Sequence, residues 1–243
     1  MHTLKRTVLV TGASSGIGRA VAQRLLQLGH TVIGVSRDCS KFTRQMANFS
    51  SVQLDLSRLN DIPPQIRQLQ QQFPEIDAVV FSAGRGQFGS LEEFSYAQIE
   101  ALMTINFTSP VFLTKALLPA LKRKTHSDLI YIGSEAALKG SRKGALYCAG
   151  KFALRGFTQA LREECANSNV RVCLINPGMV KTPFFDQLSF EPGEHESNAI
   201  LPDDVAAAVA YVLESRPQMV IDEINLSPLN KVVKFKPMPL KAG

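Results

Sequence analysis

Short apolar runs alternate with longer amphipathic segments along most of the chain. The short runs are rich in Val and Ile and show little polar alternation, which is typical of strands buried on both faces of a parallel sheet. The longer segments repeat their apolar residues at helical spacing. The pattern predicts strands at 7–10, 31–36, 52–54, 77–81, 129–132, 170–175 and 219–224, and helices at 17–28, 62–73, 96–124, 145–166 and 203–213.

This alternation predicts the fold class. Strand–helix–strand units in a parallel sheet cross over with one hand, which places helices on both faces of the sheet. We therefore expect an α/β, Rossmann-like, doubly wound parallel sheet of about seven strands. Because no linker or repeat interrupts the alternation, residues 1–243 are expected to form a single domain. Pro110 and Pro119 are expected to bend the long helix at 96–124.

The composition is that of an ordinary folded protein, with 45% hydrophobic and 20% charged residues among 243. The four cysteines form no CxxC pair and the four histidines no HxxxH, so we expect no metal site. Reduced thiols in a cytoplasmic protein are the simplest interpretation of the cysteines. No signal peptide is visible, and we expect no apolar stretch near the ~20 residues that span a bilayer, and hence no membrane partner.

The formal net charge is +6, from 27 Lys and Arg against 21 Asp and Glu. A basic chain raises the question of a polyanionic partner. The sequence has no nucleic-acid-binding motif and its basic residues do not alternate with aromatic ones, so we expect no nucleic-acid partner. The run Lys122-Arg123-Lys124 is more simply the end of a helix, where positive charge is favourable.

A glycine-rich turn joins the first expected strand to the first expected helix. Gly12, Gly16 and Gly18 allow a tight turn and close approach of a ligand to the backbone. The helix that follows offers free N–H groups and a partial positive charge to a pyrophosphate. An ordinary strand-to-helix turn is the alternative, but the flanking strand and helix favour a dinucleotide. The turn residues expected to contact it are Gly12, Ser14, Ser15, Gly16, Ile17 and Gly18.

The second expected strand ends in Ser36-Arg37-Asp38. In a dinucleotide-binding sheet this end lies beside the adenine ribose, where an acid favours NAD and an arginine accepts the 2′-phosphate of NADP. Ser36 holds the strand-terminal position, so we expect Arg37 to bind the phosphate. We expect Asp38 to point away from the ribose or to pair with a neighbouring basic side chain. NADP(H) is the expected cofactor, with NAD(H) and a plain surface role for Arg37 as alternatives. Arg19 could add charge near the same phosphate.

Tyr147 and Lys151 lie four residues apart at the start of an expected helix and share one face of it. An ammonium group there would stabilise a tyrosinate and lower a pKa that is near ~10 in free tyrosine. Ser134 follows the strand at 129–132 at the carboxyl edge of the sheet, where such folds bind their ligands. The Ser and Tyr hydroxyls can therefore converge on one carbonyl oxygen. A YxxxK pair alone is often an exposed helix face, so its combination with the glycine turn carries the argument.

Together these motifs resemble the short-chain dehydrogenases/reductases, in their standard-length form. The resemblance covers essentially the whole chain. Its motifs are Thr11-Gly12-x-x-x-Gly16-x-Gly18, Asp55, Ala83-Gly84, Asn106, Ser134, Tyr147-x-x-x-Lys151, and Asn176-Pro177-Gly178 with Thr182.

The resemblance implies a role for each matched residue. Tyr147 would be the general acid/base, Lys151 would lower its pKa and bind the nicotinamide ribose, and Ser134 would bind the substrate oxygen. Asn106 would hold a proton-relay water near Lys151, and Asp55 would contact the adenine. The other residues expected beside the cofactor are Ala83, Gly84, Pro177, Gly178, Val180 and Thr182.

The expected function is thus an NADP(H)-dependent oxidoreductase that interconverts the carbonyl and the alcohol of a small-molecule substrate. A catalytically inactive, NADP(H)-sensing regulatory protein is the alternative, although Asn106, Ser134, Tyr147 and Lys151 are all present. The resemblance also implies a homodimer or homotetramer formed through the long helices.

A substrate lid is expected at residues 183–201, where three phenylalanines and a leucine suggest an apolar wall. Gly86, Phe88 and residues 141–144 could add to its rim. The pattern leaves a ketone, an aldehyde, a sugar, a hydroxy-amino acid and an acyl-carrier thioester open as substrates. The lysine-bearing tail at 227–243 is expected to be extended, and either loosely held or used in assembly.

Two positions near the motifs raise separate questions. Ser82 stands where the family usually has the second Asn of Asn-Asn-Ala-Gly, which affects the expected packing of the loop and cofactor. Cys148, next to Tyr147, is interpreted as a small buried side chain, with an oxidisable thiol as the alternative.

Overall fold

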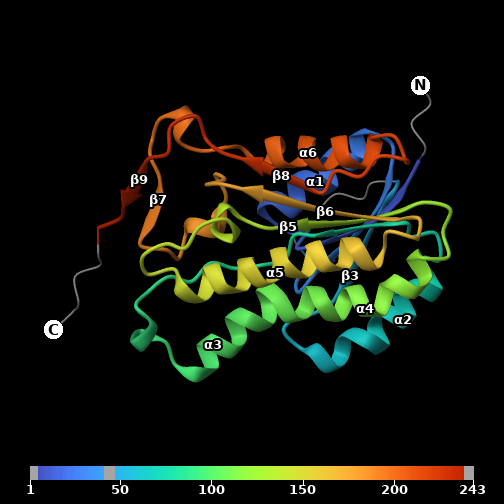
Figure 1. The fold of residues 1–243 in the computed structure, drawn as a ribbon, viewed down its shortest axis with the longest axis horizontal. Coiled ribbons are helices and arrows are strands. Elements are labelled where there is room, and N and C mark those ends of the chain that lie inside the picture. Colours follow the sequence, from blue (N-terminus) through green and yellow to red (C-terminus); the bar gives the residue numbers. More distant parts are fainter. Residues whose placement is uncertain (1–4, 41–46, 238–243) are drawn as a thin grey trace.

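Seven parallel strands form the central sheet, in the order β3-β2-β1-β4-β5-β6-β8 (Figure 1). The computed structural model of the protein describes residues 5–40 and 47–237. The strands are β1 Thr7–Thr11, β2 Thr31–Ser36, β3 Phe49–Gln53, β4 Ala78–Phe81, β5 Ser127–Ile132, β6 Val170–Pro177 and β8 Glu223–Leu226. The main helices are α1 Gly16–Gln27, α2 Ile62–Gln72, α3 Tyr96–Met103, α4 Ser109–Leu121, α5 Ala145–Glu164 and α6 Pro202–Glu214. The predicted doubly wound α/β fold is confirmed.

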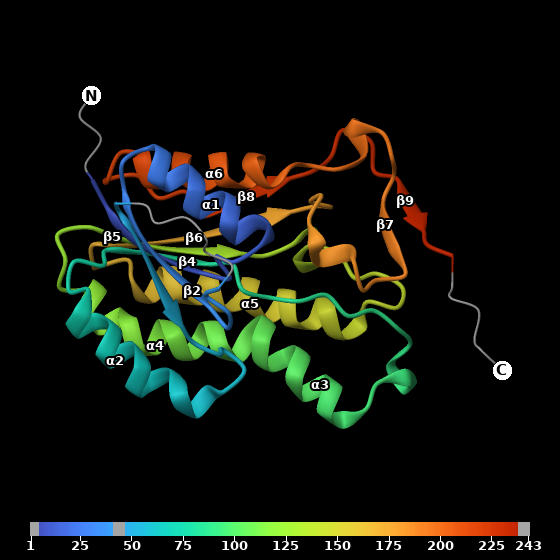
Figure 2. The ribbon, with the colours of Figure 1, turned by 180° about the vertical axis from the view of Figure 1, so that it is seen from behind.

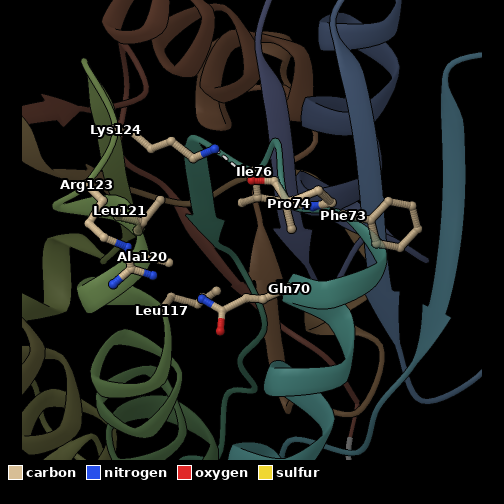
Figure 3. A pocket seen from close by; sticks show the side chains of 9 residues that line it. All are labelled: Gln70, Phe73, Pro74, Ile76, Leu117, Ala120, Leu121, Arg123 and Lys124. Atoms are coloured by element: carbon tan, nitrogen blue, oxygen red, sulfur yellow. Dashed lines mark hydrogen bonds between the residues drawn. The ribbon is translucent and has the colours of Figure 1, made fainter.

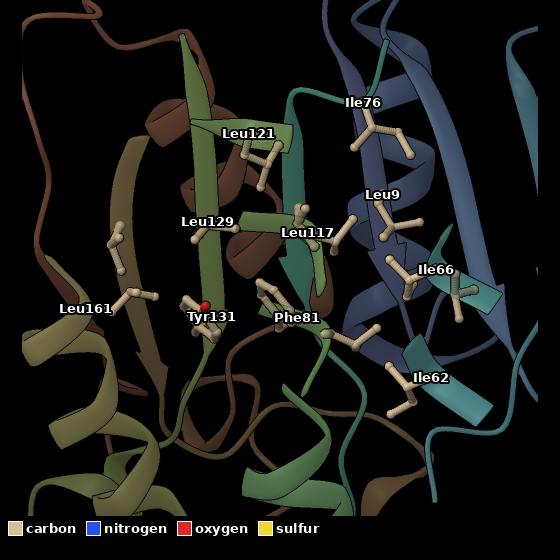
Figure 4. Packing of buried hydrophobic residues seen from close by; sticks show 14 of the residues in the cluster. Leu9, Ile62, Ile66, Ile76, Phe81, Leu117, Leu121, Leu129, Tyr131 and Leu161 are labelled. Atoms are coloured by element: carbon tan, nitrogen blue, oxygen red, sulfur yellow. The ribbon is translucent and has the colours of Figure 1, made fainter. Parts of the chain in front are cut away.

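Helices cover both faces of the sheet, with α1 and α6 on one face and α2, α4 and α5 on the other (Figures 1 and 2). Side chains alternate between the faces along each strand, so β1 sends Leu9 toward α2 and α4 but Val8 and Val10 toward α1 and α6. Figure 4 shows Leu9, Phe81 and other residues of the larger core cluster. Full burial of each such side chain contributes about 1.5–3 kcal/mol.

Two edge strands begin at positions that the hydrophobic pattern did not predict. The strand expected at 219–224 is observed as β8 from Glu223, because the Arg171 guanidinium binds the Met219 carbonyl and holds that residue in the turn before the strand. The strand expected at 52–54 is β3 from Phe49, whose ring packs over Gly34 of β2. Polar residues at exposed sheet edges weaken the pattern that marks a buried strand.

The long helix is interrupted before Pro110 rather than at both prolines. Residues Thr104–Thr108 form a π-helical turn between α3 and α4, whereas Pro119 lies inside the continuous α4. Pro110 has no N–H, so the α-helical bond to the carbonyl of Asn106, four residues earlier, cannot form. The turn widens where Asn106 lies, and such π-bulges are frequent at functional sites.

The run from Tyr96 to Leu121 is 26 residues long and contains an 18-residue stretch with a mean hydropathy of 1.3, so the expectation that no apolar stretch approaches membrane-spanning length is wrong for this segment. Only the length and composition of this segment suggest a membrane-spanning helix, and the core helix of a folded domain can have the same length and composition. Leu113, Leu117 and Leu121 of this run pack in the core against the sheet. The run is thus accounted for by packing within the domain.

A buried network of charges lies at the edge of the sheet opposite to the ends where the predicted site residues gather. Asp128 of β5 is 0% exposed. Its carboxylate forms ion pairs with Arg171 Nε (2.7 Å) and Arg6 Nη2 (2.9 Å), and His126 Nε2 lies 3.2 Å from it. Arg6 Nε also binds Asp77 at 2.8 Å. The network links the starts of β1, β4, β5 and β6.

The lid and the tail form a second, two-stranded antiparallel sheet that the pattern did not predict. It consists of β7, Phe190–Pro192, and β9, Val233–Phe235. Both views show these strands projecting beyond the carboxyl edge of the main sheet (Figures 1 and 2). The tail is extended as predicted, but up to residue 237 it is bonded to the lid rather than loosely held, and its remaining residues lie outside the described part of the chain.

Candidate active site

The glycine turn has the local geometry expected of a phosphate-binding turn. Gly12 has a φ of 69°, and a Cβ there would lie only 3.0 Å from the Cα of Ala83. A Cβ on Gly18 would overlap the carbonyl oxygen of Gly12. The backbone is therefore bare where α1 begins, with Ser15 extended at its N-cap. Arg19 donates to the Ser14 carbonyl, which keeps its positive charge beside the turn.

The end of β2 presents Arg37 to solvent. The Asp38 carboxylate accepts hydrogen bonds from the N–H (2.9 Å) and hydroxyl (2.6 Å) of Ser40. Asp55 lies within electrostatic reach of Arg37. Burial acts to raise the pKa of the Asp55 carboxyl, but hydrogen bonds from Ser57 and the positive charges of Arg37 and Arg58 hold this pKa below its usual value.

The departure at Ser82 leaves the loop after β4 well supported. Thr11 Oγ1, at the end of β1, accepts the main-chain N–H groups of Ser82 (3.0 Å) and Ala83 (3.1 Å). The anchor of the loop is therefore its main chain rather than the side chain at 82. Gly84 follows, and a Cβ there would lie 2.9 Å from Asn106 Oδ1.

Asn106 is buried in the π-helical turn and locks the next loop residue. Its Oδ1 accepts the Arg85 N–H (3.0 Å) and its Nδ2 donates to the Arg85 carbonyl (2.9 Å). These two bonds hold the carboxamide against Arg85, while the main-chain carbonyl of Asn106 has no α-helical partner because Pro110 lacks an N–H.

Ser134 is held from the neighbouring strand. Its main-chain N–H donates to Asn176 Oδ1 (3.3 Å), while Asn176 Nδ2 donates to Glu223 Oε1 (2.7 Å) and Asn225 Oδ1 (3.0 Å). Arg155 Nε of α5 donates to Glu223 Oε2 at 3.1 Å. A chain of contacts from α5 through β8 and β6 thus orients the serine.

Tyr147 and Lys151 lie on one face at the start of α5, both almost fully buried. Burial raises the pKa of Tyr147 to about 12, and the nearby Ser134 side chain opposes this rise only in part. Burial lowers the pKa of Lys151 to about 8. Its Nζ donates to the Ile132 carbonyl (3.0 Å) and lies 5.8 Å from the centroid of the Tyr147 ring. The lower tyrosine pKa implied by the resemblance is therefore not produced by the polypeptide alone.

The residues expected beside the nicotinamide meet at the end of β6. Gly178 N–H donates to the Leu226 carbonyl (2.7 Å), and a Cβ on Gly178 would approach Pro228 and Glu135. Thr182 lies over Gly16 of the phosphate turn, where a Cβ would be 3.5 Å from the Thr182 Cβ. Val180 is buried and bridges to Ile200. The predicted site residues are thus gathered along one edge of the sheet.

Aromatic rings cover Tyr147, which is only 7% exposed. The ring centroid of Phe88 lies 5.1 Å from that of Tyr147, and the centroid of Phe184 lies 5.9 Å from it. Phe190 packs edge-on against Phe88 at 4.9 Å. The predicted apolar wall is present, and Phe88, expected at its rim, is in direct contact with the tyrosine.

A family comparison agrees with this geometry. Residues 6–192 match the model of the short chain dehydrogenase family. The chain belongs to the short-chain dehydrogenases. It is therefore an oxidoreductase of the class that acts on an alcohol or carbonyl group of a small molecule with a nicotinamide cofactor.

Curated and solved relatives span nearly the whole of this short-chain dehydrogenase. Sepiapterin reductase from Chlorobaculum tepidum is 28% identical over 239 residues, which cover 93% of this chain and 97% of the relative. The NADP-dependent 3-hydroxy acid dehydrogenase of Schizosaccharomyces pombe is 27% identical over 241 residues, 92% of each chain. A metagenomic short-chain oxidoreductase solved in complex with NADP is 30% identical, with a TM-score of 0.80 over 93% of this chain and 99% of that one.

A cavity of about 300 Å³ lies away from these residues, between the ends of α2 and α4 (Figure 3). Phe73, Ile76 and Leu117 form part of its lining. The ammonium group of Lys124 points across it and donates to the Pro74 carbonyl at 2.6 Å. No predicted site residue of this short-chain dehydrogenase lines the cavity, because it lies near the start of β4 rather than its end.

The supporting contacts of three residues were not predicted from the sequence. Arg85 binds Asn106 through its main chain, and Asn176 and Glu223 orient Ser134 through side chains. Asn176 belongs to a matched motif, but nothing in that motif assigns its carboxamide to Ser134. The partners lie 21, 42 and 47 residues apart in the chain, and no local pattern reports such distances.

Proposed function

We propose that the protein is an NADP(H)-dependent oxidoreductase that interconverts a carbonyl and an alcohol, with Tyr147 as the general acid/base. The observation that carries the proposal is the placement of Ser134 and Tyr147 together at the carboxyl edge of the sheet, where Ser134 acts on the pKa of the tyrosine, one helical turn from the buried Lys151. Two positioned O–H donors are the arrangement needed where a carbonyl oxygen gains negative charge.

The proposed roles of the residues follow from this arrangement. The bound dinucleotide would supply or accept the hydride. In the reducing direction, the carbonyl carbon gains that hydride, the electron pair of the C=O bond moves to oxygen, and Tyr147 donates its proton there. Ser134 binds the same oxygen and stabilises its charge. Lys151 favours the transient tyrosinate, and the carbonyl of Asn106, left without an α-helical partner by Pro110, would help return the proton.

The glycine turn, Arg37 and Thr182 would hold the dinucleotide. Gly12 and Gly18 leave the cradle bare, and the start of α1 offers N–H groups to its phosphates. The comparison structure bound to NADP supports the choice of that cofactor.

Replacing Arg37 with Leu is expected to weaken NADPH binding by about 10- to 100-fold and leave NADH binding nearly unchanged, because charge-assisted hydrogen bonds contribute about 1.5–3 kcal/mol. Fluorescence titration with each cofactor measures both constants. Arg67→Leu, on the exposed side of α2, is the matched control. An equal loss of both cofactors would show that Arg37 does not read the 2′-phosphate.

The function itself is tested by NADPH oxidation in the presence of a panel of small ketones, aldehydes and 2-keto or 3-keto acids. Turnover of at least one class is expected. Tight NADPH binding without turnover of any of them would contradict the proposed reaction.

The reduction rate is expected to fall as pH rises through about 8, where Lys151 loses its charge. The sign follows from burial, which lowers the pKa of the ammonium, so Lys151 is charged below that pH and neutral above it. Tyr147, with a pKa of about 12, keeps its proton throughout this range. The pH profile of kcat/KM measures this fall. In Lys151→Arg the cation persists, so the profile of this variant should stay flat through pH 8. A variant profile that still fell as in the wild type would assign the fall to another group.

We further propose a homodimer or homotetramer formed through the face of α4 and α5, where Phe152 is 44% exposed. Light scattering after size-exclusion chromatography measures this state directly. The cytoplasmic location expected from the cysteines stays a prediction.

A further inference from the structure

The tail, up to residue 237, is joined to the lid by main-chain hydrogen bonds within β9 and on both sides of it. Within the β7–β9 pair, Phe190 lies opposite Phe235 and Pro192 opposite Val233. Beyond the pair, Gly193 N–H donates to the Val232 carbonyl (3.0 Å) and Lys236 N–H donates to the Ser189 carbonyl (2.8 Å). The tail therefore runs beside the lid as a strand.

Lysine side chains of the tail add a second set of contacts. The ammonium of Lys236 donates to the Phe185 carbonyl (2.5 Å), at the end of a single helical turn in the lid. Lys234 pairs with Glu194 of the lid (2.5 Å). Lys231 pairs with Glu135 (2.7 Å), the residue after Ser134. The tail lysines thus contact the lid and the margin of the site, and Lys231 and Lys234 are paired there with glutamates.

The segment that the tail holds is the one that covers the tyrosine. Phe184 contacts Tyr147, and Phe185 packs between Phe184 (5.2 Å) and Phe190 (5.9 Å). Lys236 binds the carbonyl of Phe185, and Phe235 pairs with Phe190 in the strand register. Phe185 therefore bonds to the tail directly, and Phe184 and Phe190 each adjoin a residue that does.

We propose that residues 229–237 form a strap that positions the lid phenylalanines against Tyr147, with Lys236 as its main positioning residue. By holding this wall in one arrangement, the strap favours carbonyl substrates with a compact apolar group over bulky ones. The match to the family model ends at residue 192, so the strap lies outside the pattern shared with the family. This inference rests on the proposed carbonyl reduction.

The physical reason is preorganisation. The lid has three short elements and little core of its own, and a segment with few buried contacts samples several arrangements unless it is tied down. A wall fixed in advance costs a compact substrate less ordering on binding. Loosening it should raise KM for a compact substrate more than it lowers kcat, because Tyr147 and Ser134 are positioned by α5, β5 and β6.

Lys236→Met and Lys236→Pro form a graded test. The first removes the ammonium and keeps the aliphatic stem, whereas the second also removes the main-chain N–H that binds Ser189. Lys122→Met, on the exposed end of α4, is the matched control for loss of a lysine. Hydrogen–deuterium exchange of the peptide covering 183–193 reads the lid without requiring catalysis, and the exchange of β1 and β5 peptides shows whether the fold is intact.

Exchange in 183–193 is expected to rise about tenfold in Lys236→Met and further in Lys236→Pro, with the strand peptides unchanged. KM for cyclohexanone should rise about tenfold with a smaller change in kcat, and the kcat/KM ratio of cyclohexanone to 4-phenylcyclohexanone should fall. Unchanged lid exchange in both variants would overturn the strap. Faster lid exchange with an unchanged ketone ratio would overturn its role in specificity. A wild-type enzyme inactive on every carbonyl would count against the proposed reaction, and the exchange result would still decide the strap.

Discussion

Tyr147→Phe is expected to lower kcat by about 10³-fold while leaving NADPH affinity unchanged. The substitution removes one hydroxyl from a side chain whose ring remains packed against Phe88 and Phe184. Lys151 Nζ is bonded to the Ile132 carbonyl, and Ser134 Oγ accepts the Ala136 N–H, so neither is expected to take over the role of the tyrosine hydroxyl. Steady-state kinetics and a cofactor titration measure the two effects separately.

Tyr211→Phe is the matched control, because Tyr211 is exposed on α6 and removal of its hydroxyl group should leave kcat unaltered. If Tyr147→Phe retained most of the activity, Tyr147 could not be the proton donor. A combined loss of activity and NADPH binding would instead point to a disturbed cofactor site.

Asp128→Asn is expected to lower the free energy of unfolding by about 3–5 kcal/mol, because it leaves two buried guanidinium groups without their shared carboxylate. Arg171 and Arg6 both bind Asp128, and Arg171 also donates to the carbonyls of Val212 and Met219. Urea unfolding measures the change. The site lies at the opposite edge of the sheet, so NADPH affinity of the folded variant should be preserved.

The same substitution should matter less in acid. Burial acts to raise the pKa of Asp128, but its hydrogen bonds to His126 and Arg171 and the charges of Arg6 and Arg171 hold this pKa below its usual value. A depressed carboxyl pKa stabilises the fold above the unfolded value of about 3.9, and this contribution is lost as pH falls through the folded value.

Asp222→Asn removes a surface partner of Arg162 and is the control for the buried pair. Asp222 is 70% exposed, so its loss should cost no more than about 1 kcal/mol. Equal effects of the two substitutions would mean that the buried network contributes no more than a surface ion pair.

Local spacing in the sequence was enough to predict the fold class and to propose which residues share a helix face or a tight turn. Strand–helix alternation determines a doubly wound sheet, since buried parallel strands and amphipathic helices have few other ways to cover their apolar faces. The i, i+4 spacing of Tyr147 and Lys151 determines a shared helix face whatever surrounds it. The positive φ of Gly12 and the clash that a Cβ on Gly18 would make with the Gly12 carbonyl are both local to the turn.

Tertiary structure decided what surrounds those groups. The pKa of Tyr147 depends on burial by Phe88 and Phe184, which come from two distant segments. The register of β6 and β8 brings Glu223 to Asn176, and through it orients Ser134. Neither arrangement has a sequence signature, because contact between residues far apart in the chain depends on the packing of the whole domain.

The tail shows this division most clearly. Lysines and prolines predicted an extended, basic segment, and residues up to 237 are extended. Nothing in that pattern distinguishes a solvated tail from a strand, because Lys234 and Lys236 gain their partners only where the fold places Glu194 and the Phe185 carbonyl beside them. The sequence by itself determined which residues carry charge and chemistry, whereas the tertiary structure decided which groups they meet, since electrostatic and hydrogen-bonding energies depend on distance in space and not along the chain.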